Sequence, residues 1–533
     1  MITLESGSIS LINITISFLL CVIVLKCLSQ LVNGFWIIPK RLEKCLNQQG
    51  LIGNSYKFLV GDLKENSRLR DQAFNKPFPF THYYFPRTQP LLHNLLESSG
   101  GDRRCYTWMG PVPTVLITEH ELIRDVFTRM NLFKKPKLNY LLEILLSGLV
   151  QYEGEKWAKH RKLINPAFHT QKLKFMLPAF QTSISEELEK WEGLVTKTGS
   201  AEIDVWPSLL SITADAISRA AFGSSFQDGR KIFDLITEQK DIVMRNMKFS
   251  FIPGWKYFPT KAKKRLDETH KEIQDLLNGI IGKRKKAMEV GEAAKDDVLG
   301  ILLESNFREA KLMETQNVGG KKQYALSFLE MVEECKLFYN AGQETTAVLL
   351  VWTMILLGKH QDWQAQAREE VLATFGHNQP DFDGLNNRLK IVTMILYEVL
   401  RLYPPIGATS RRLYDRETKV GDLTVPPGVV LSLSIIHAHL DPKVWGDDAK
   451  EFNPERFSQG INKATKGTNA YLPFGWGPRI CIGQNFALIE AKMVMAIILQ
   501  RYSFELSPSY IHAPTSFIAV SPQHGAHIIL HRL

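Results

Sequence analysis

The chain has 533 residues, and its 44% apolar, 10% aromatic and 23% charged residues are typical of a globular protein, which excludes a disordered or collagen-like chain. At about 150 residues per domain, this length first suggests three or four domains. Lys and Arg outnumber Asp and Glu by 65 to 55, and a formal charge of +10 suits an anionic partner such as nucleic acid, a lipid surface or an acidic protein. The six cysteines form no C-x-x-C pair, which excludes a disulfide scaffold and argues against a cysteine-cluster zinc site.

An uncharged apolar run from Ile9 to Leu25 predicts a membrane-spanning helix, because about 20 helical residues cross a bilayer. No Lys or Arg precedes the run, so it lacks the basic start of a cleavable signal peptide, and we interpret residues 1–33 as a signal anchor. Basic residues follow it at Lys26, Lys40, Arg41 and Lys44. The positive-inside rule then places the N-terminus in the lumen and the rest of the chain in the cytosol. A buried N-terminal core helix is the alternative.

The rest of the chain predicts a mainly α protein with small β-sheets. Helical periodicity dominates from about Glu119 to Leu402. Strand patterns are confined to Thr114–Thr118, to Gly421–Leu433 and to the last twenty residues. The short stretch Asn317–Gln323 is the nearest approach to a linker, and no domain boundary is evident after the anchor. We therefore expect a hinge over residues 34–45 and one domain over 46–533.

Two basic runs, Lys261–Arg265 and Lys283–Lys286, could indicate nucleic-acid binding. Neither run has aromatic residues within it, and both lie on faces of helices that we expect to be exposed. We interpret them as solvated surface and predict no nucleic-acid partner.

A long helix is predicted from about Phe328 to Lys359, and Ser327 with Glu330 forms a plausible capping box at its start. Gly342 near its middle costs about 1 kcal/mol relative to alanine, which suggests that a missing side chain is needed there. Thr345 can turn its hydroxyl toward the carbonyl of Ala341 one turn earlier, which opens a groove. Glu344 supplies an acidic neighbour. Without other motifs, such a threonine is more typical of a structural hydroxyl.

The most informative segment is Phe474–Gly483, which directly precedes a helix-forming stretch. A cysteine before a helix N-terminus is favoured as a thiolate, the form that binds metals, so Cys481 is a candidate ligand. Gly477 and Gly483 permit a loop to press against a flat cofactor, and Arg479 could pair with an anionic group on it. A buried, inert cysteine is the alternative. A dinucleotide motif is excluded because Ile480 stands where the third glycine is needed.

This segment resembles the haem-binding signature F-x-x-G-x-R-x-C-x-G of the cytochrome P-450 superfamily at every fixed position. The resemblance implies that Cys481 is the axial thiolate on the iron of haem b, where electron donation promotes O–O cleavage. It also implies haem contacts from the surrounding signature residues and from the start of the groove motif: Phe474, Gly475, Arg479, Gly483, Ala341 and Gly342. The groove segment resembles the oxygen-binding motif of the family, in which Thr345 and Glu344 would help to deliver protons.

Further motifs follow in the family's order. Trp157 and Arg161 resemble the W-x-x-x-R pair that contacts haem propionates, and Arg411 matches a further propionate-binding position. His437 and His439 are expected to pack or to form hydrogen bonds rather than to bind iron.

Glu398 and Arg401 lie three residues apart on one helix face, where an ion pair alone is common and weak. With Pro454–Phe457 they resemble the E-x-x-R and PERF elements of the family. Glu398, Arg401 and Arg456 are therefore assigned a scaffold role.

The resemblance covers essentially the whole chain and is strongest to the plant seventy-two clan, on Phe474–Ala487, Asn340–Thr346 and Ala167–His169. The proline-rich hinge is reduced to Trp36-x-x-Pro39, as in that clan. Known clan activities imply oxidation of a terpenoid, such as a triterpene, an iridoid, a gibberellin or a brassinosteroid.

The implied protein is a monooxygenase of the endoplasmic reticulum that inserts one oxygen atom from O2 into a C–H bond of a bulky apolar substrate. Electrons would come from NADPH through a separate reductase, since the chain has no flavin or nicotinamide motif. Family topology implies substrate contacts from Leu141–Val150, Phe338, Ala341 and Ile406–Thr409. Two alternatives remain: a hydroperoxide-rearranging member, which typically lacks the groove threonine, and a membrane-tethered haem-binding protein without turnover.

Overall fold

The computed structural model describes residues 2–98, 104–196, 199–223, 226–249, 254–291, 297–315 and 326–533. The expected linker at 317–323 lies outside these residues.

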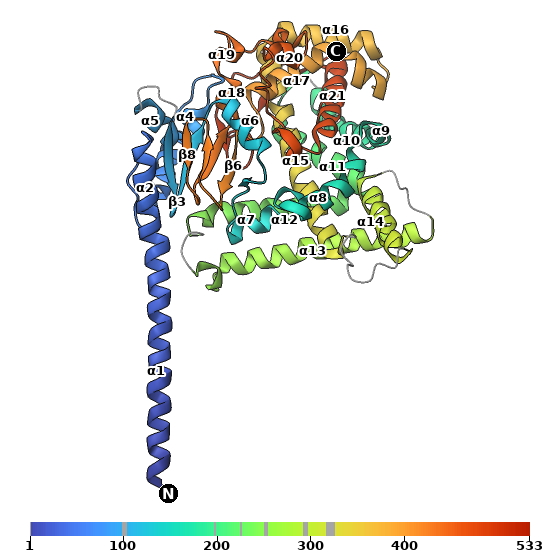
Figure 1. The fold of residues 1–533 in the computed structure, drawn as a ribbon. Coiled ribbons are helices and arrows are strands. Elements are labelled where there is room, and N and C mark those ends of the chain that lie inside the picture. The colour runs from blue at the N-terminus through green and yellow to red at the C-terminus, as the bar shows by residue number, and fades with distance from the viewer. Residues whose placement is uncertain are drawn as a thin grey trace.

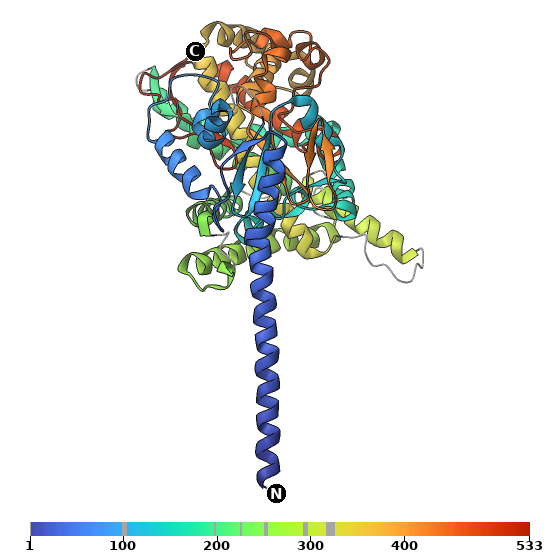
Figure 2. The same cartoon turned by 60° about the vertical axis from the view of Figure 1, so that its left-hand side comes forward.

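The N-terminal helix stands apart from the body of the protein. Helix α1 (Ile2–Val32) continues through a π-helical turn (Asn33–Ile37) into α2 (Ile38–Gln48), and α1 projects away from the folded body in both views (Figures 1 and 2). The described part from Thr15 to Gln48 is long and apolar enough to cross a membrane, and none of its most apolar window is buried. It is therefore a candidate transmembrane helix, and the alternative of a buried core helix is wrong. The helix runs on through residues 34–45, and the expected domain limits stay predictions.

The main sheet has six strands in the order β1-β2-β3-β9-β6-β4. The sheet is assembled from distant segments: β1 (Ile52–Gly53), β2 (Cys105–Met109), β3 (Val112–Ile117), β9 (Val430–Ser434), β6 (Ala408–Leu413) and β4 (Phe133–Lys134). Central strands β3 and β9 are parallel, with Val115 paired to Leu431, and β6 runs antiparallel to β9 with Arg411 opposite Leu431. This register places Arg411 in β6, between β9 and the edge strand β4.

The described residues also form three smaller sheets. One has the order β10-β13-β5, and the others are the pairs β11-β12 and β7-β8. Their bounds are β10 (Tyr502–Leu506), β13 (His527–Arg532), β5 (Ser200–Asp204), β11 (Pro514–Ser516), β12 (Val520–Pro522), β7 (Thr418–Val420) and β8 (Leu423–Val425). The prediction of a mainly α protein with small sheets is confirmed.

Helix α15 (Phe328–Lys359) runs through the helical part of the body (Figure 1). Its 32 residues give a length of about 48 Å. The capping box is confirmed, since Glu330 N donates to Ser327 Oγ at 3.2 Å and Ser327 N donates to Glu330 Oε2 at 2.9 Å. α15 is also long and apolar enough to cross a membrane, but 72% of its most apolar segment is buried inside the protein. α15 is therefore a core helix.

The other helices that matter for the site pack around α15 and the main sheet. They are α7 (Tyr140–Leu145), α8 (Gly154–Ile164), α11 (Val205–Phe222), α12 (Phe226–Asn246), α13 (Lys261–Glu289), α17 (Lys390–Leu402) and α21 (Gln484–Arg501). Among them, α11, α17 and α21 pack directly against α15. Both basic runs lie on α13. The Lys264 side chain is 81% exposed, as expected for a solvated face, whereas Arg284 of the second run is 12% exposed and pairs with Asp297 at 2.5 Å.

Candidate functional site

Cys481 lies in a tight loop directly before α21. Its N–H donates to the carbonyl of Phe474 at 2.9 Å, which closes the loop on itself. Gly475 and Gly477 have φ angles of +76° and +73°, in the left-handed region that favours glycine. At Gly483 an added Cβ would lie 4.0 Å from the Cys481 sulfur. The glycines therefore allow the tight path of the loop and leave the sulfur uncovered.

The environment of the Cys481 sulfur combines burial with exposed surface. Burial raises the pKa of Cys481, and the Gly483 amide and the Arg161 guanidinium oppose this rise. Burial is the largest of these influences on the thiol, whereas the amide and the guanidinium both favour the thiolate. Yet the side chain retains exposed surface. The Cys481 side chain therefore keeps accessible surface beside the Gly483 amide and the Arg161 guanidinium.

Helix α15 has a matching exposed position at Ala341. The residues before it, Leu337 to Asn340, are buried, and burial resumes at Thr346. Thr345 Oγ1 donates to the carbonyl of Ala341 at 2.7 Å, as predicted. An added Cβ at Gly342 would meet Ile217 of α11 at 3.0 Å, so this glycine allows two helices to approach closely.

The carboxylate of Glu344 is held by a neighbouring helix. Lys240 Nζ of α12 pairs with Glu344 Oε2 at 2.7 Å, and the two side chains are 15% and 21% exposed. The sequence predicted an acidic neighbour for Thr345, but it gave no sign of the lysine about a hundred residues earlier.

Side chains of α8 are bound directly to the cysteine loop. Arg161 Nη1 donates to the carbonyl of Ile480 at 2.8 Å. The guanidinium of Arg479 lies 4.5 Å from the ring centroid of Trp157, and its Nη2 pairs with the carboxylate of Glu153. The structure thus brings together Trp157, Arg161, Arg479 and Cys481 from segments more than 300 residues apart in the chain.

Arg411 and Lys135 extend this positive cluster. Burial and the nearby charge of Arg479 lower the pKa of Arg411 to about 10. Burial, Arg411 and Arg479 lower the pKa of Lys135 to about 7, and Glu153 raises it. Lys135 Nζ donates to the carbonyl of Val150. Sequence reasoning missed Lys135, because the F-K-K-P stretch carries no signal of what lies opposite it.

The donor set in this cluster suits a dianionic group. Among the described residues, Glu153 is the carboxylate that interacts electrostatically with Lys135, Arg411 and Arg479, so basic groups outnumber acidic groups in this largely buried cluster. Two further carboxylates would balance it. The residues therefore fit a haem, whose iron would be held by Cys481 and whose two propionates would lie among the cations.

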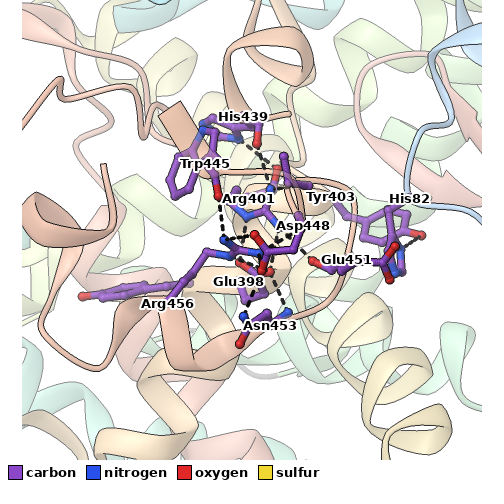
Figure 3. A network of polar contacts seen from close by, with 12 residues as sticks. His82, Glu398, Arg401, Tyr403, His439, Trp445, Asp448, Glu451, Asn453 and Arg456 are labelled. Atoms are coloured by element: carbon purple, nitrogen blue, oxygen red, sulfur yellow. Dashed lines mark hydrogen bonds and ion pairs between the residues drawn. The ribbon is translucent and has the colours of Figure 1, made fainter. Parts of the chain in front are cut away.

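A buried polar network joins Glu398 and Arg401 of α17 to residues 439–456 (Figure 3). Arg401 donates to both carboxylate oxygens of Glu398 at 2.7 Å, and both side chains are fully buried. Arg456 Nε donates to the same carboxylate at 3.2 Å and also pairs with Asp448 at 2.8 Å. Arg401 further donates to the carbonyl of Glu451 at 3.0 Å. Since the network uses its charges on one another and on the backbone, it fits the expected scaffold role.

His439 connects this network to the cysteine loop. Its Nδ1 contacts the carbonyl of Arg401 at 3.0 Å, and its Nε2 accepts from the N–H of Leu472 at 2.8 Å. Burial lowers the pKa of His439 to about 3, so the ring stays neutral and can accept this bond. His437 contacts Ser434 Oγ at 2.7 Å. Both histidines therefore form hydrogen bonds, as expected.

Two of the expected substrate contacts lie in different environments. Phe338 is buried, with its ring centroid 5.5 Å from that of Phe168. Ala408, in the stretch 406–409, is exposed at the start of β6. Their contact with a substrate stays a prediction.

Fold and site together have the features of a haem-thiolate protein. A model of the family Cytochrome P450 matches residues 99–526, and the chain belongs to that family. The family and fold imply a haem cofactor, and the protein is a cytochrome P450 monooxygenase.

The chain is similar to plant relatives over nearly its whole length. It is 58% identical to echinocystic acid 23-monooxygenase of Saponaria officinalis, over 96% of this chain and 98% of that protein. It is 52% identical to cytochrome P450 72A397 of Kalopanax septemlobus, over 95% of each chain, and 50% identical to cytochrome P450 72A15 of Arabidopsis thaliana, over 98% of this chain and all of that one. The resemblance to the seventy-two clan is thereby confirmed.

A solved structure shares the fold. Retinoic acid bound cyanobacterial CYP120A1 superposes with a TM-score of 0.72 at 23% identity, over 90% of this chain and 98% of that one.

Proposed function

We propose that the protein is a membrane-anchored monooxygenase that oxidises a C–H bond of a triterpenoid with O2 and with electrons from NADPH-cytochrome reductase. The similarity to echinocystic acid 23-monooxygenase supports the substrate class. The observation that carries the site is the exposed sulfur of Cys481 inside the body, next to a cluster of cations.

Each part of the site has a proposed role. Cys481 binds the iron, and Phe474, Gly475 and Gly483 shape the loop against the macrocycle. Arg161, Arg411, Arg479 and Trp157 bind the propionate side, and Lys135 joins them. Ala341 and Gly342 form the opposite wall. When bound, the haem supplies the activation of dioxygen.

Thr345 and Glu344 of α15 deliver protons to the site. The Thr345 hydroxyl, which donates to the Ala341 carbonyl, can instead donate into the groove, since a hydroxyl rotates freely. Glu344 can resupply this proton when its carboxylate leaves Lys240 and first takes up a proton from water. The presence of Thr345 favours oxygen-dependent turnover over hydroperoxide rearrangement.

The anchor supports a location in the endoplasmic reticulum, with the N-terminus in the lumen and the catalytic body in the cytosol. Deletion of residues 2–33 should release much of the protein from membranes without loss of haem. Haem loss in the deleted protein would contradict an anchor that is separate from the catalytic body.

The decisive experiment expresses the full chain in microsomes and supplies a panel of triterpenoids, including echinocystic acid, with mass-spectrometric detection of products. Product should require NADPH, reductase and O2 together. Product from a hydroperoxide without reductase would support the rearranging alternative. Substrate-induced spectral shifts without product under any condition would support a binding protein.

The iron ligand is tested separately. Cys481→Ser should abolish the thiolate-type carbon monoxide difference band, and a band retained in this variant would refute the assignment. Cys45→Ser serves as the control because Cys45 lies in α2, and its band should be unchanged.

A further inference from the structure

Residues 144–153, which we call the strap, form a segment that contacts helix α15 at one end and the cysteine loop at the other. At one end the carbonyl of Leu145 accepts from Asn340 Nδ2 at 3.3 Å, and Asn340 directly precedes the exposed Ala341. At the other end the carbonyl of Tyr152 accepts from Arg479 Nη1 at 2.8 Å, two residues from Cys481. The strap therefore runs from a contact next to Ala341 to a contact near Cys481.

Three polar side chains of α15 hold this strap by its backbone. Lys336 Nζ donates to the carbonyl of Ile144, and Asn340, one turn later on the same face, donates to the next carbonyl. Glu334 Oε2 accepts from the N–H of Leu149 at 3.0 Å. The exposed fractions of Lys336, Asn340 and Glu334 are 2%, 7% and 0%. Polar groups buried to this degree are costly unless bonded, and the strap supplies their partners.

The surroundings show that the fit at Glu334 is tight. Its Oε1 lies 2.6 Å from Nδ1 of the buried His160, which belongs to α8 between Trp157 and Arg161. Gly148 of the strap has φ +71°, and a Cβ there would lie 2.9 Å from Glu334 Oε2. Glycine is thus required for the strap to approach α15 so closely.

Lys336 is fixed from a second side as well. Its Nζ lies 3.2 Å from Nδ1 of His270 on α13, so the ammonium group bridges α7, α13 and α15. Since the ends of the strap are held by α15 and by Arg479, its distance from the haem side of the site is set by side chains that need not touch a substrate.

We infer that Glu334, Lys336 and Asn340 are positioning residues that fix the strap over the reacting site and thereby determine which bulky ligands enter and which carbon they present. This inference rests on the proposed haem site. It assigns selectivity to a polar clamp on the backbone, in addition to the apolar side chains that line the site.

The test uses the full-length ferric holoenzyme in lipid nanodiscs and two probes of the iron, imidazole and the bulkier 4-phenylimidazole, titrated by absorbance. Lys336→Met keeps the aliphatic stem and loses the donor, and Asn340→Leu is nearly isosteric. Each variant should change the ratio of the two dissociation constants by at least about fivefold. Amide hydrogen exchange over 144–149 should accelerate at least about tenfold.

Lys492→Met is the matched control. Lys492 is also buried and donates to a backbone carbonyl, that of Leu385, at 3.0 Å. Like Lys336, it has a pKa lowered by burial to about 8. Lys492→Met should leave the ratio of the two dissociation constants and the amide hydrogen exchange over 144–149 unchanged.

The outcomes separate the inference from the proposed site. An absent optical response to imidazole in the unaltered protein would refute the haem site. A normal response, with an unchanged ratio and unchanged exchange in Lys336→Met and Asn340→Leu, would overturn the clamp. If Lys336→Met fails to fold, Asn340→Leu alone decides, because it removes a neutral donor and leaves no buried charge.

Discussion

Lys240 Nζ of α12 and Glu344 Oε2 of α15 form an ion pair at 2.7 Å. Glu344 directly precedes Thr345. Both side chains are largely shielded from water, so the pair is screened less than one on the surface. The acid of the motif is therefore tied to a second helix, and any movement of α12 relative to α15 changes its freedom.

A double-mutant cycle measures this pair. Lys240→Met, Glu344→Gln and the double variant should give a coupling energy of about 1 kcal/mol, at the upper end for exposed pairs, because the groups are partly buried. Chemical unfolding of each variant supplies the free energies. Strict additivity of the two single changes would mean that the pair contributes nothing to stability.

Thr345→Ala should separate NADPH consumption from product formation. The change removes a hydroxyl that can donate into the groove, and the fraction of NADPH converted to product should fall on the order of tenfold. The measurement is product formed per NADPH oxidised, with hydrogen peroxide quantified alongside.

Thr353→Ala is the control for this variant. Thr353 lies on the same helix and donates to Leu349 O at 2.7 Å, as Thr345 does to Ala341, but it is buried in the core. Equal loss of coupling in both variants would indicate a helix defect rather than a role in proton delivery.

Lys135 predicts a pH dependence of haem affinity. Its pKa is lowered to about 7, so above this pH the free protein must take up a proton before the lysine can pair with a propionate. Haem affinity should fall as pH rises above about 7, by up to about tenfold per pH unit.

Substitutions at Lys135 separate charge from packing. Lys135→Arg keeps the charge and should remove this pH dependence, whereas Lys135→Met should remove it and bind haem more weakly throughout. Competition with apomyoglobin over a pH series provides the measurement. An unaltered pH profile in both variants would place the titrating group elsewhere.

Glu490 of α21 predicts a pH dependence of stability. It is fully buried, and burial raises its pKa well above the usual value even though the Thr346 hydroxyl opposes the rise. Between about pH 4.3 and its folded pKa, the native state keeps a proton that the unfolded state loses. Stability should therefore fall by about 1.4 kcal/mol per pH unit as pH rises through this range.

Glu490→Gln removes this titration, so the variant should gain stability relative to the parent as pH rises above about 4.3. Chemical unfolding midpoints of the parent and of Glu490→Gln, measured at a series of pH values, test this prediction. Glu505→Gln, at a side chain that is 55% exposed, should show no comparable trend. A parallel fall in parent and Glu490→Gln would show that Glu490 is ionised in the folded protein.

The sequence predicted those parts of the molecule that depend on local spacing. Ser327 and Glu330 are three residues apart, and Thr345 is one turn from Ala341, so helix geometry alone places their bonds. Glu398 and Arg401 were likewise found from spacing, although their complete burial was not visible in an i,i+3 pattern.

Contacts between distant segments could not be predicted in this way. Lys135, Lys240 and Glu334 have no motif around them, and each gains its importance from a partner or neighbour at least about a hundred residues away, fixed only by the packing of helices and strands. Strand β6 was missed because Arg411 and Arg412 interrupt its apolar pattern, and its pairing with β9 decides its structure.

The continuous helix from α1 into α2 has a mechanical consequence. Tyr56 donates its hydroxyl to the carbonyl of Phe35 at 2.7 Å, and the ring of Trp36 lies 6.2 Å from that of Tyr56, so the base of the helix is fastened to the body. If α1 is embedded in a bilayer, a change in the tilt of this helix therefore changes the orientation of the whole body. Bilayer thickness would then set the height and inclination of the body above the lipid, since a thinner membrane tilts the helix further.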